Sequence, residues 1–216
     1  MTKAMLRLGL TGGIASGKTA VAAMLREMGF AVLDADSLAH TLIEPGQPAY
    51  DEVVREFGAS ILDSVSRVDR TKLAAIVFAD PAKLARLNAI LHPRVETVIH
   101  QQFAEWSRNG TRDAAFVEAA LLVEAGYHKN LDGLVVTWCR SDQQLDRLRA
   151  RGFSDEDARR RIGAQLPVAE KLRVATEKID CSGSLEDTRT QVAALAAKLR
   201  RPLDDRVILK RTDEVR

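Results

Sequence analysis

A stretch of eight residues near the start of the chain has the composition and spacing of a phosphate-binding loop. Residues Gly12–Thr19 read GGIASGKT and fit the pattern G-x-x-x-x-G-K-[ST]. Glycines let a backbone wrap closely around an anion, at the positive end of a following helix. Lys18 would reach the outer phosphates, and the Thr19 hydroxyl would bind Mg²⁺. The alternative is a glycine-rich turn with a solvated lysine. The residues expected to contact the nucleotide are Gly13, Ile14, Ala15, Ser16, Gly17, Lys18, Thr19 and Ala20.

Two aspartates follow the next apolar run, Phe30–Leu33, in the order Asp34-Ala35-Asp36. A kinase needs a carboxylate that accepts the proton of the acceptor hydroxyl and orients its oxygen for in-line attack. Asp36 is the candidate for this general base. The alternative is that Asp36 caps a helix that begins at Ser37, because aspartate is also a good N-cap residue. Asp34 is expected to have a structural or a metal-water role.

Further charged side chains would complete a phosphate-transfer site. Glu118 ends an apolar run and would hold a water bound to Mg²⁺, or else be a solvated carboxylate at a strand end. The segment 147–173 is rich in arginine, a residue that binds phosphate through two hydrogen bonds; the alternative is a solvated helix face. Arg147 and Arg151 are spaced to share one helix face. The arginines of this segment are Arg147, Arg149, Arg151, Arg159, Arg160, Arg161 and Arg173.

The phosphate-binding loop, the two aspartates and Glu118 each follow an apolar run that predicts a strand of a parallel sheet. Met5–Leu10 has the apolar pattern of a buried strand, and apolar residues at helical spacing follow the loop up to Gly29, a typical helix C′ residue. Strands alternating with helices predict an α/β fold with a five-stranded parallel sheet and helices on both faces. Ligands bind such sheets beyond the carboxyl ends of the strands, where the loop, the two aspartates and Glu118 fall. The other predicted strands are Phe30–Leu33, Ala114–Val117, Leu134–Trp138 and Lys178–Asp180.

Two stretches have no place in the predicted sheet. Residues 37–107 are rich in helical patterns and are expected to form an insertion that covers a substrate. Residues 147–173 are expected to form a helical lid over polyphosphate, with a capping box that begins at Ser154. Both would belong to one domain of 216 residues. The last residues, 201–216, are charged without a clear apolar stripe and predict a loose tail or a partner-dependent helix.

Composition narrows the class of protein. Apolar residues make up 46% and charged residues 29% of the chain, which is ordinary for a globular protein. The net charge of +2 gives no reason to expect nucleic acid as a partner. No apolar run approaches the length of a membrane span, and no room is left for a signal peptide. Cys139 and Cys181 lack metal-ligand spacing and favour a reducing compartment, so the cytoplasm is expected.

The order and spacing of several motifs resemble the dephospho-CoA kinase family, which catalyses the last step of coenzyme A synthesis. The resemblance covers Leu6 to about Leu199. It implies transfer of the γ-phosphate of ATP to the 3′-hydroxyl of dephospho-CoA, with Mg²⁺. It also implies a nucleotide-binding core, a helical CoA domain and a lid. The motifs are LTGGIASGKT, VLDADSLAH followed by EPG, LNAILHP, LLVE at Leu121–Glu124, and GAQ at Gly163–Gln165.

The resemblance also implies roles for single residues. Lys18 and its loop would bind ATP. Asp36 matches the catalytic aspartate of the family, and Arg147 matches a lid arginine that contacts phosphates, with Arg151 nearby. His92 falls in the HP motif near the acceptor site; the alternative is that His92-Pro93 caps and kinks a helix.

Three positions depart from the family pattern. Ala15 stands where a glycine is usual, which predicts a negative φ at this residue. Ala120 stands where a proline is usual. Cys181 replaces an asparagine, which puts contacts on the adenine side in doubt without touching phosphate transfer.

Other functions remain possible on the residues alone. One is a different kinase of the nucleoside monophosphate kinase type, which would differ only in its acceptor. A second is a P-loop NTPase switch, although the chain has no N-K-x-D motif for guanine. A third is a non-catalytic nucleotide-binding module. For the leading hypothesis the expected partners are ATP and dephospho-CoA, with no nucleic acid and no membrane, and the chain is expected to be a monomer or a weak homo-oligomer.

Overall fold

The computed structural model describes residues 5–110 and 113–200. The segment 201–216, for which the sequence predicts a loose tail, lies outside the described residues. The chain forms two compact units. The first unit holds the described residues up to Leu33 and from Glu105 onward, and the second unit is Asp34–Ala104. The predicted insertion, 37–107, overlaps almost all of the Asp34–Ala104 unit, and its substrate-binding role stays a prediction.

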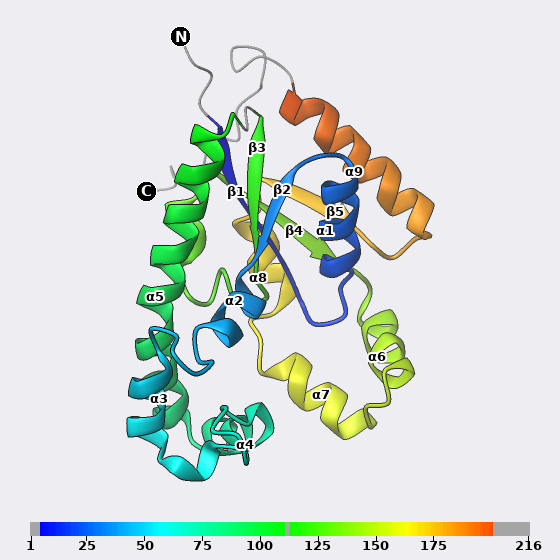
Figure 1. Ribbon diagram of the computed structural model, residues 1–216. Coiled ribbons are helices and arrows are strands. Elements are labelled where there is room, and N and C mark those ends of the chain that lie inside the picture. The colour runs from blue at the N-terminus through cyan, green and yellow to red at the C-terminus, as the bar shows by residue number, and fades with distance from the viewer. Residues whose placement is uncertain (1–4, 111–112, 201–216) are drawn as a thin grey trace, which may run out of the picture. The chain divides into compact units, whose positions relative to one another are not determined.

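A five-stranded sheet in the order β2-β3-β1-β4-β5 forms the centre of the first unit (Figure 1). The pairs that β1 makes with β3 and β4, and β4 with β5, are parallel. The predicted five-stranded parallel sheet of an α/β fold is therefore confirmed. The strands are β1 (Leu6–Gly12), β2 (Ala31–Asp34), β3 (Ala114–Glu118), β4 (Gly133–Trp138) and β5 (Glu177–Asp180).

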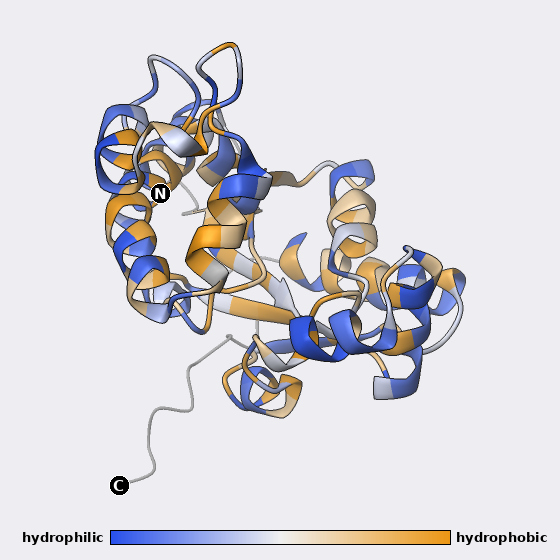
Figure 2. Ribbon diagram, turned by 90° about the horizontal axis from the view of Figure 1, so that it is seen from below, coloured by the Kyte–Doolittle hydropathy of each residue, from blue (hydrophilic) through white to orange (hydrophobic). Residues whose placement is uncertain are grey.

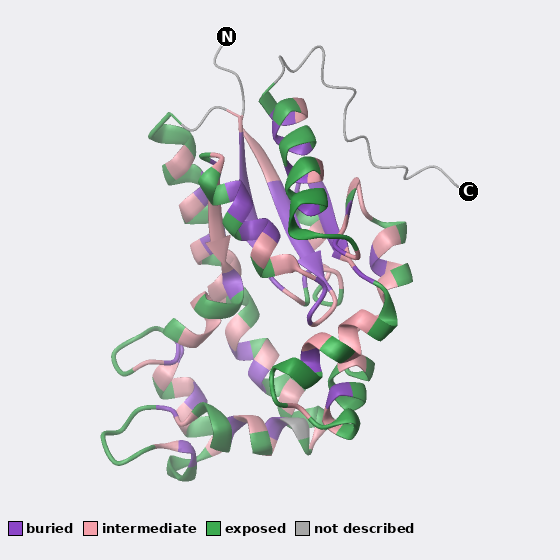
Figure 3. Cartoon of the chain, turned by 90° about the vertical axis from the view of Figure 1, so that its right-hand side faces the viewer, coloured by how far each residue is buried: buried purple, intermediate pink, exposed green. Residues whose placement is uncertain are grey.

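The register of the central strands brings the candidate residues to one edge. In β1, Leu10 lies opposite Glu118 of β3, and Gly12 lies opposite Thr137 of β4. The phosphate loop, Gly12–Thr19, therefore leaves the sheet between the carboxyl ends of two neighbouring strands. Figure 3 shows how deeply these strands are buried. Such an edge is where parallel sheets bind ligands.

Helices cover both faces of the sheet. On one face α1 (Lys18–Glu27) and α9 (Leu185–Arg200) share a core with Leu8 and Leu10 of β1. Side chains alternate along a strand, so Gly9 and Thr11 face the other side. On that side α8 (Val168–Arg173) contacts β4, and Lys171 of α8 and Thr11 both donate to the Ala120 carbonyl. The prediction of helices on both faces is correct.

Two more helices of the first unit follow β4. They are α6 (Ser141–Ala150) and α7 (Asp155–Gly163), and the one-turn helix η2 (Tyr127–Asn130) precedes β4. The Ser154 side chain accepts a hydrogen bond from the Asp157 amide at the start of α7, as the predicted capping box requires. Figure 2 shows that helices of the protein carry both hydrophilic and hydrophobic residues.

The second unit has a hydrophobic core of its own. Its buried members include Val53, Ile61 and Ile90. Arg94 of α5 pairs with Glu52 of α3, which joins two helices of the unit. No helix among the described residues is long and apolar enough to span a bilayer. The elements are α2 (Ala35–Thr41), α3 (Tyr50–Phe57), η1 (Ala59–Ile61), α4 (Arg70–Phe78) and α5 (Pro81–Arg108), whose last turn extends beyond the unit.

Candidate functional site

The phosphate loop contains two residues with positive φ. Gly17, the residue before α1, has φ 98°, and Ala15 has φ 58°. The prediction of a negative φ at Ala15 is therefore wrong. An alanine in the left-handed region costs about 1 kcal/mol, because its Cβ approaches the following carbonyl oxygen. Other contacts of the loop must offset this cost.

Neighbouring strands leave no space for side chains at the two motif glycines. A Cβ at Gly12 would lie 2.2 Å from the Thr137 hydroxyl oxygen and 2.4 Å from that of Ser16. A Cβ at Gly17 would lie 2.7 Å from the Cys181 sulfur. The Ser16 and Thr137 hydroxyls, 2.8 Å apart, share a hydrogen bond that ties the loop to β4. Gly12 is thus required for close packing, and Gly17 for close packing and for its positive φ.

Some amide groups of the loop are engaged within the protein. The Ser16 amide donates to the Gly13 carbonyl at 3.1 Å, and the Ile14 amide donates to Oε1 of Gln165 at 2.7 Å. Both amides therefore donate to acceptors of the protein itself. The Ile14 carbonyl accepts from Nε2 of Gln144. Sequence reasoning missed both glutamines as loop contacts, although Gln165 ends the GAQ motif.

Lys18 and Glu118 meet at the carboxyl edge of the sheet. The Lys18 ammonium lies 3.0 Å from one Glu118 oxygen, and the Arg26 guanidinium lies 3.5 Å from the other. The Glu118 side chain is only 4% exposed. The alternative of a solvated strand-end carboxylate is therefore wrong. Glu118 holds the lysine of the motif beside the loop.

The residues present fit a magnesium ion that arrives with a nucleotide. Mg²⁺ keeps several waters and binds one or two protein groups together with substrate phosphates. Among residues 5–110 and 113–200, no group of three or more His, Cys, Asp or Glu could hold a metal by itself. Thr19 lies exposed in the first turn of α1, a suitable position for a single hydroxyl ligand. The water-mediated role of Glu118 stays a prediction.

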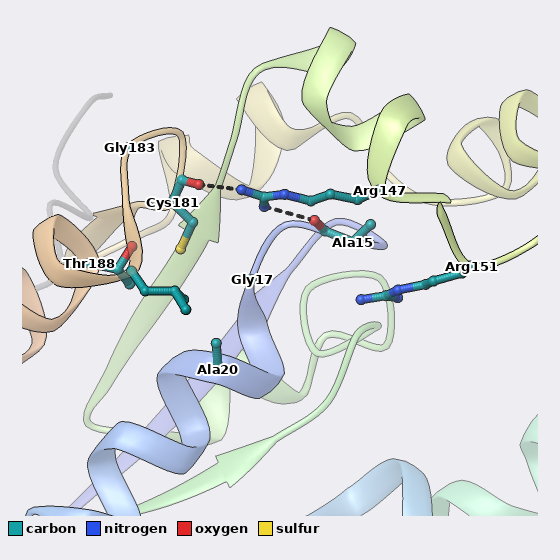
Figure 4. Close-up of a pocket in the computed structure, with 9 residues that line it drawn as sticks. Ala15, Gly17, Ala20, Arg147, Arg151, Cys181, Gly183 and Thr188 are labelled. Carbon is teal, nitrogen blue, oxygen red and sulfur yellow. Dashed lines mark hydrogen bonds between the residues drawn. The ribbon is translucent and has the colours of Figure 1, made fainter. Parts of the chain in front are cut away.

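A pocket of about 330 Å³ lies beside the loop (Figure 4). Ala15, Gly17, Arg147 and Arg151 contribute to its lining, together with the start of α9. Arg147 donates to the Ala15 carbonyl at 3.1 Å and to the Cys181 carbonyl at 2.6 Å. It therefore bridges the loop and the end of β5. Arg151 caps the C-terminus of α6. Contact of either arginine with phosphate stays a prediction.

Both cysteines lie buried near this pocket as free thiols. Burial raises the pKa of the Cys181 thiol to about 11, partly offset by its hydrogen bond with Thr188 and by the charge of Arg147. Burial likewise raises the pKa of Cys139. Both side chains are therefore protonated at neutral pH and are poor nucleophiles. Cys181 stands where an asparagine was expected. Its backbone carbonyl accepts a hydrogen bond from Arg147, and its side chain packs in the hydrophobic core.

The two aspartates after β2 have different positions. Asp34 is the N-cap of α2: its carboxylate accepts from the Ser37 amide at 2.9 Å and from the Ser37 hydroxyl at 2.8 Å. The helix therefore begins at Ala35, two residues earlier than expected. Asp36 lies exposed in its first turn. The alternative that Asp36 caps the helix is wrong, and the predicted structural role of Asp34 is correct.

His40 lies one turn after Asp36, and sequence reasoning did not single it out. Burial and the charge of Arg70 lower the pKa of His40, although Asp36, Asp34 and Glu44 act in the opposite direction. The imidazole is therefore neutral at pH 7 and adds no positive charge beside the Asp36 carboxylate. The i, i+4 spacing on one helix was the available signal.

His92 lies exposed inside α5, next to Pro93. Since α5 begins at Pro81, the alternative that His92-Pro93 caps a helix is wrong. The predicted position of His92 near the phosphate-acceptor site stays a prediction.

Comparison with known proteins identifies the family. The dephospho-CoA kinase family model matches residues 6–187. The chain belongs to the dephospho-CoA kinase family. It is therefore an ATP-dependent kinase, a phosphotransferase. A dephospho-CoA kinase of Symbiobacterium thermophilum is 46% identical over 87% of this chain and 78% of its own length. One from Aquifex aeolicus is 43% identical over 91% of this chain and 99% of its own length.

Solved structures agree with this assignment. A crystal structure of TT1252 from Thermus thermophilus has a TM-score of 0.79 and 36% identity, over 92% of this chain and all of that one. Dephospho-CoA kinase from Campylobacter jejuni has a TM-score of 0.67 and 25% identity, over 89% and 96% of the two chains.

One departure from the dephospho-CoA kinase pattern has a simple structural explanation. The Ala120 carbonyl accepts from the Thr11 hydroxyl at 3.1 Å and from the Lys171 ammonium at 2.7 Å. A proline would keep this carbonyl. These contacts therefore need only the backbone of residue 120, and alanine preserves them.

Proposed function

We propose that this chain transfers the γ-phosphate of ATP to the 3′-hydroxyl of the ribose of dephospho-CoA, giving CoA and ADP. The observation that carries the proposal is a glycine-rich loop with positive φ at Ala15 and Gly17, next to the Lys18–Glu118 pair. Membership of the dephospho-CoA kinase family supports the choice of acceptor. The reaction would take place in the cytoplasm, and the chain would act as a monomer or a weak homo-oligomer.

The donor side would act mainly by placing positive charge around the phosphates. Phosphate loops bind polyphosphate through backbone amides and the helix dipole, and the motif lysine neutralises charge that builds up on the transferred group. Lys18 would exchange its contact with Glu118 for phosphate oxygens. The Thr19 hydroxyl would help to hold Mg²⁺, which would supply positive charge to the phosphates. Arg147 and Arg151, from the lid 147–173, would add hydrogen bonds to the phosphates.

The acceptor side would depend on Asp36. Its carboxylate would accept the proton of the 3′-hydroxyl as the ribose oxygen forms a bond to the γ-phosphorus. The bond between that phosphorus and the β–γ bridging oxygen breaks, and ADP leaves with the electron pair. His92 and the insertion 37–107 would bind dephospho-CoA and exclude water from the reaction.

The test is ADP release by the purified chain with ATP·Mg²⁺, measured with dephospho-CoA and with a panel of nucleoside monophosphates. We expect turnover with dephospho-CoA only, and a product phosphorylated at the 3′-oxygen. Turnover of another acceptor without dephospho-CoA would replace the proposal by a different small-molecule kinase. ATP hydrolysis that no acceptor stimulates would favour a P-loop switch.

A further inference from the structure

Ile14, at the tip of the phosphate loop, has both of its backbone polar groups bound by glutamine side chains. Oε1 of Gln165 accepts from the Ile14 amide at 2.7 Å, and Nε2 of Gln144 donates to the Ile14 carbonyl at 2.5 Å. Gln144 belongs to α6, and Gln165 follows α7. The sequence pattern of a phosphate loop places no demand on either glutamine.

Gly13 leaves room for the end of the Gln144 side chain. A Cβ at this position would lie 2.9 Å from Nε2 of Gln144 and 4.0 Å from Oε1 of Gln165. The G-x-x-x-x-G-K-[ST] pattern leaves the residue after its first glycine open. The absence of a side chain at Gly13 therefore suits the Gln144 contact, which the motif alone does not require.

The side chains at the tip pack into the same region. Ala15 is buried with Leu148 and Ala158, and Ile14 packs against this cluster. Other side chains of α6 and α7 complete a small core. The contributors from these helices and the loop between them are Leu145, Leu148, Phe153, Ala158 and Ile162. The loop tip is thus part of the hydrophobic core of the α6–α7 pair.

An ion pair with a buried lysine fixes the backbone next to Gln165. Lys171 is fully buried and lies 2.9 Å from a Glu124 carboxylate oxygen. The same oxygen accepts from the Leu166 amide at 2.9 Å. Because a buried ammonium needs polar partners, Lys171 holds the Glu124 carboxylate in place. It thereby orients Gln165 toward Ile14.

We infer that Gln165 is a positioning residue for nucleotide binding, acting through Ile14 rather than by contact with the nucleotide. The inference rests on the proposed use of the loop for ATP. Gln165 and Gln144 hold the peptide groups that flank Ile14, and Arg147 holds the Ala15 carbonyl. These bonds keep Ala15 in a left-handed conformation that alanine alone disfavours. Without them the tip relaxes, and its amides lose their arrangement for phosphate.

The test removes the side-chain oxygen of Gln165 that accepts from the Ile14 amide, once in the unsubstituted chain and once in an Ala15→Gly variant. Gln165→Met keeps the length and volume of the side chain but cannot accept a comparable hydrogen bond from the Ile14 amide. We expect the Kd for ADP, measured by calorimetry without acceptor, to rise about fivefold, as the loss of one hydrogen bond predicts. In an Ala15→Gly background, where positive φ is not strained, the same change should raise Kd about twofold or less.

Controls separate positioning from general destabilisation. Gln101→Met, at an exposed position of α5, should leave the Kd for ADP unchanged. If Gln165→Met fails to fold, Gln144→Met replaces it. This change removes the hydrogen bond to the Ile14 carbonyl, and we expect the same rise in the Kd for ADP. An unchanged Kd, or an equal rise in both backgrounds, would overturn the inference. Because ADP binding needs no acceptor, failure to phosphorylate dephospho-CoA would overturn the proposed function alone.

Discussion

The phosphate loop and the Asp36 helix differ in how their candidate groups are held. In the first unit Ile14, Ala15 and Lys18 all bind side chains of other elements. In the second unit Asp36 and His92 lie exposed on helices. The groups of the proposed donor half are therefore held by the fold, whereas those of the proposed acceptor half lie at the surface of their own unit.

The difference follows from the chemistry that each half would perform. Stabilising the charge of a transferring phosphate requires donors that are already oriented, since reorienting them during the reaction costs free energy. Accepting a proton requires only that a carboxylate comes within hydrogen-bond reach of the hydroxyl, and such contacts often form only in the complex. We therefore expect substitutions in the two halves to act on different steps.

The largest effect is expected for Asp36→Asn. Loss of a general base lowers kcat by about 10²–10⁴-fold, while the Kd for ATP should change less than about threefold, because the carboxylate acts in the chemical step. Single-turnover ADP release and ATP calorimetry measure the two quantities. Asp51→Asn, an exposed aspartate in the first turn of α3, is the matched control. A loss of ATP affinity as large as the loss of kcat would remove the contrast between the halves.

A smaller effect, on stability, is expected for Gly12→Ala. The new Cβ would meet the Thr137 hydroxyl oxygen at 2.2 Å and its carbonyl oxygen at 2.6 Å. Overpacking of this kind costs about 1–3 kcal/mol, which thermal unfolding would show as a clearly lower Tm. Gly163→Ala is the matched change, because nothing lies within 4 Å of its Cβ position. The Gly163 variant should unfold at or above the temperature of the unsubstituted chain. Equal losses in both variants would show that steric fit in the loop is not the cause.

Local sequence patterns predicted the position of the loop in the fold well. The G-x-x-x-x-G-K-T spacing between a strand and a helix placed Gly12 and Lys18 at one edge of a parallel sheet, and the apolar run Ala114–Val117 placed Glu118 at the same edge. Each of these inferences concerns backbone conformation or strand order, which depend on short stretches of sequence. The burial of Glu118 was harder to predict from the sequence, because it depends on contacts with Lys18 and Arg26, which belong to a different element.

Contacts between distant segments could not be predicted in this way. The Ile14–Gln165 hydrogen bond joins residues 151 positions apart, and no local periodicity encodes it. The positive φ of Ala15 occurs together with a contact of this kind, the hydrogen bond from Arg147 to its carbonyl, and residue type alone led to the opposite expectation. Helix capping was misassigned for a related reason: Asp34 and Asp36 are both good N-caps, and the geometry of the chain leaving β2 selects Asp34.

A smaller effect again is expected at Asp34, where two substitutions distinguish a cap from a metal role. Asp34→Ala removes the acceptor for the Ser37 amide and should cost about 1 kcal/mol, whereas Asp34→Asn keeps a good cap and should cost a few tenths. Denaturant unfolding measures both. If Asp34→Asn instead lowers kcat as strongly as Asp34→Ala at saturating Mg²⁺, the charge of Asp34 is required and its role is not structural alone.

The smallest effect concerns the Cys181 thiol and appears only at alkaline pH. Burial raises its pKa to about 11 in the folded chain, from an ordinary value of 9.0. The folded state therefore binds this proton more tightly than the unfolded state. The resulting stability is complete below pH 9 and is lost as the pH rises toward 11. Tm measured from pH 8 to pH 11 should fall less steeply in Cys181→Ala than in the unsubstituted chain. Because other groups titrate in both proteins, the difference between the two curves isolates this thiol. Identical slopes would mean that Cys181 ionises in the fold as readily as in the unfolded chain, and that the pocket beside the phosphate loop admits water to its sulfur.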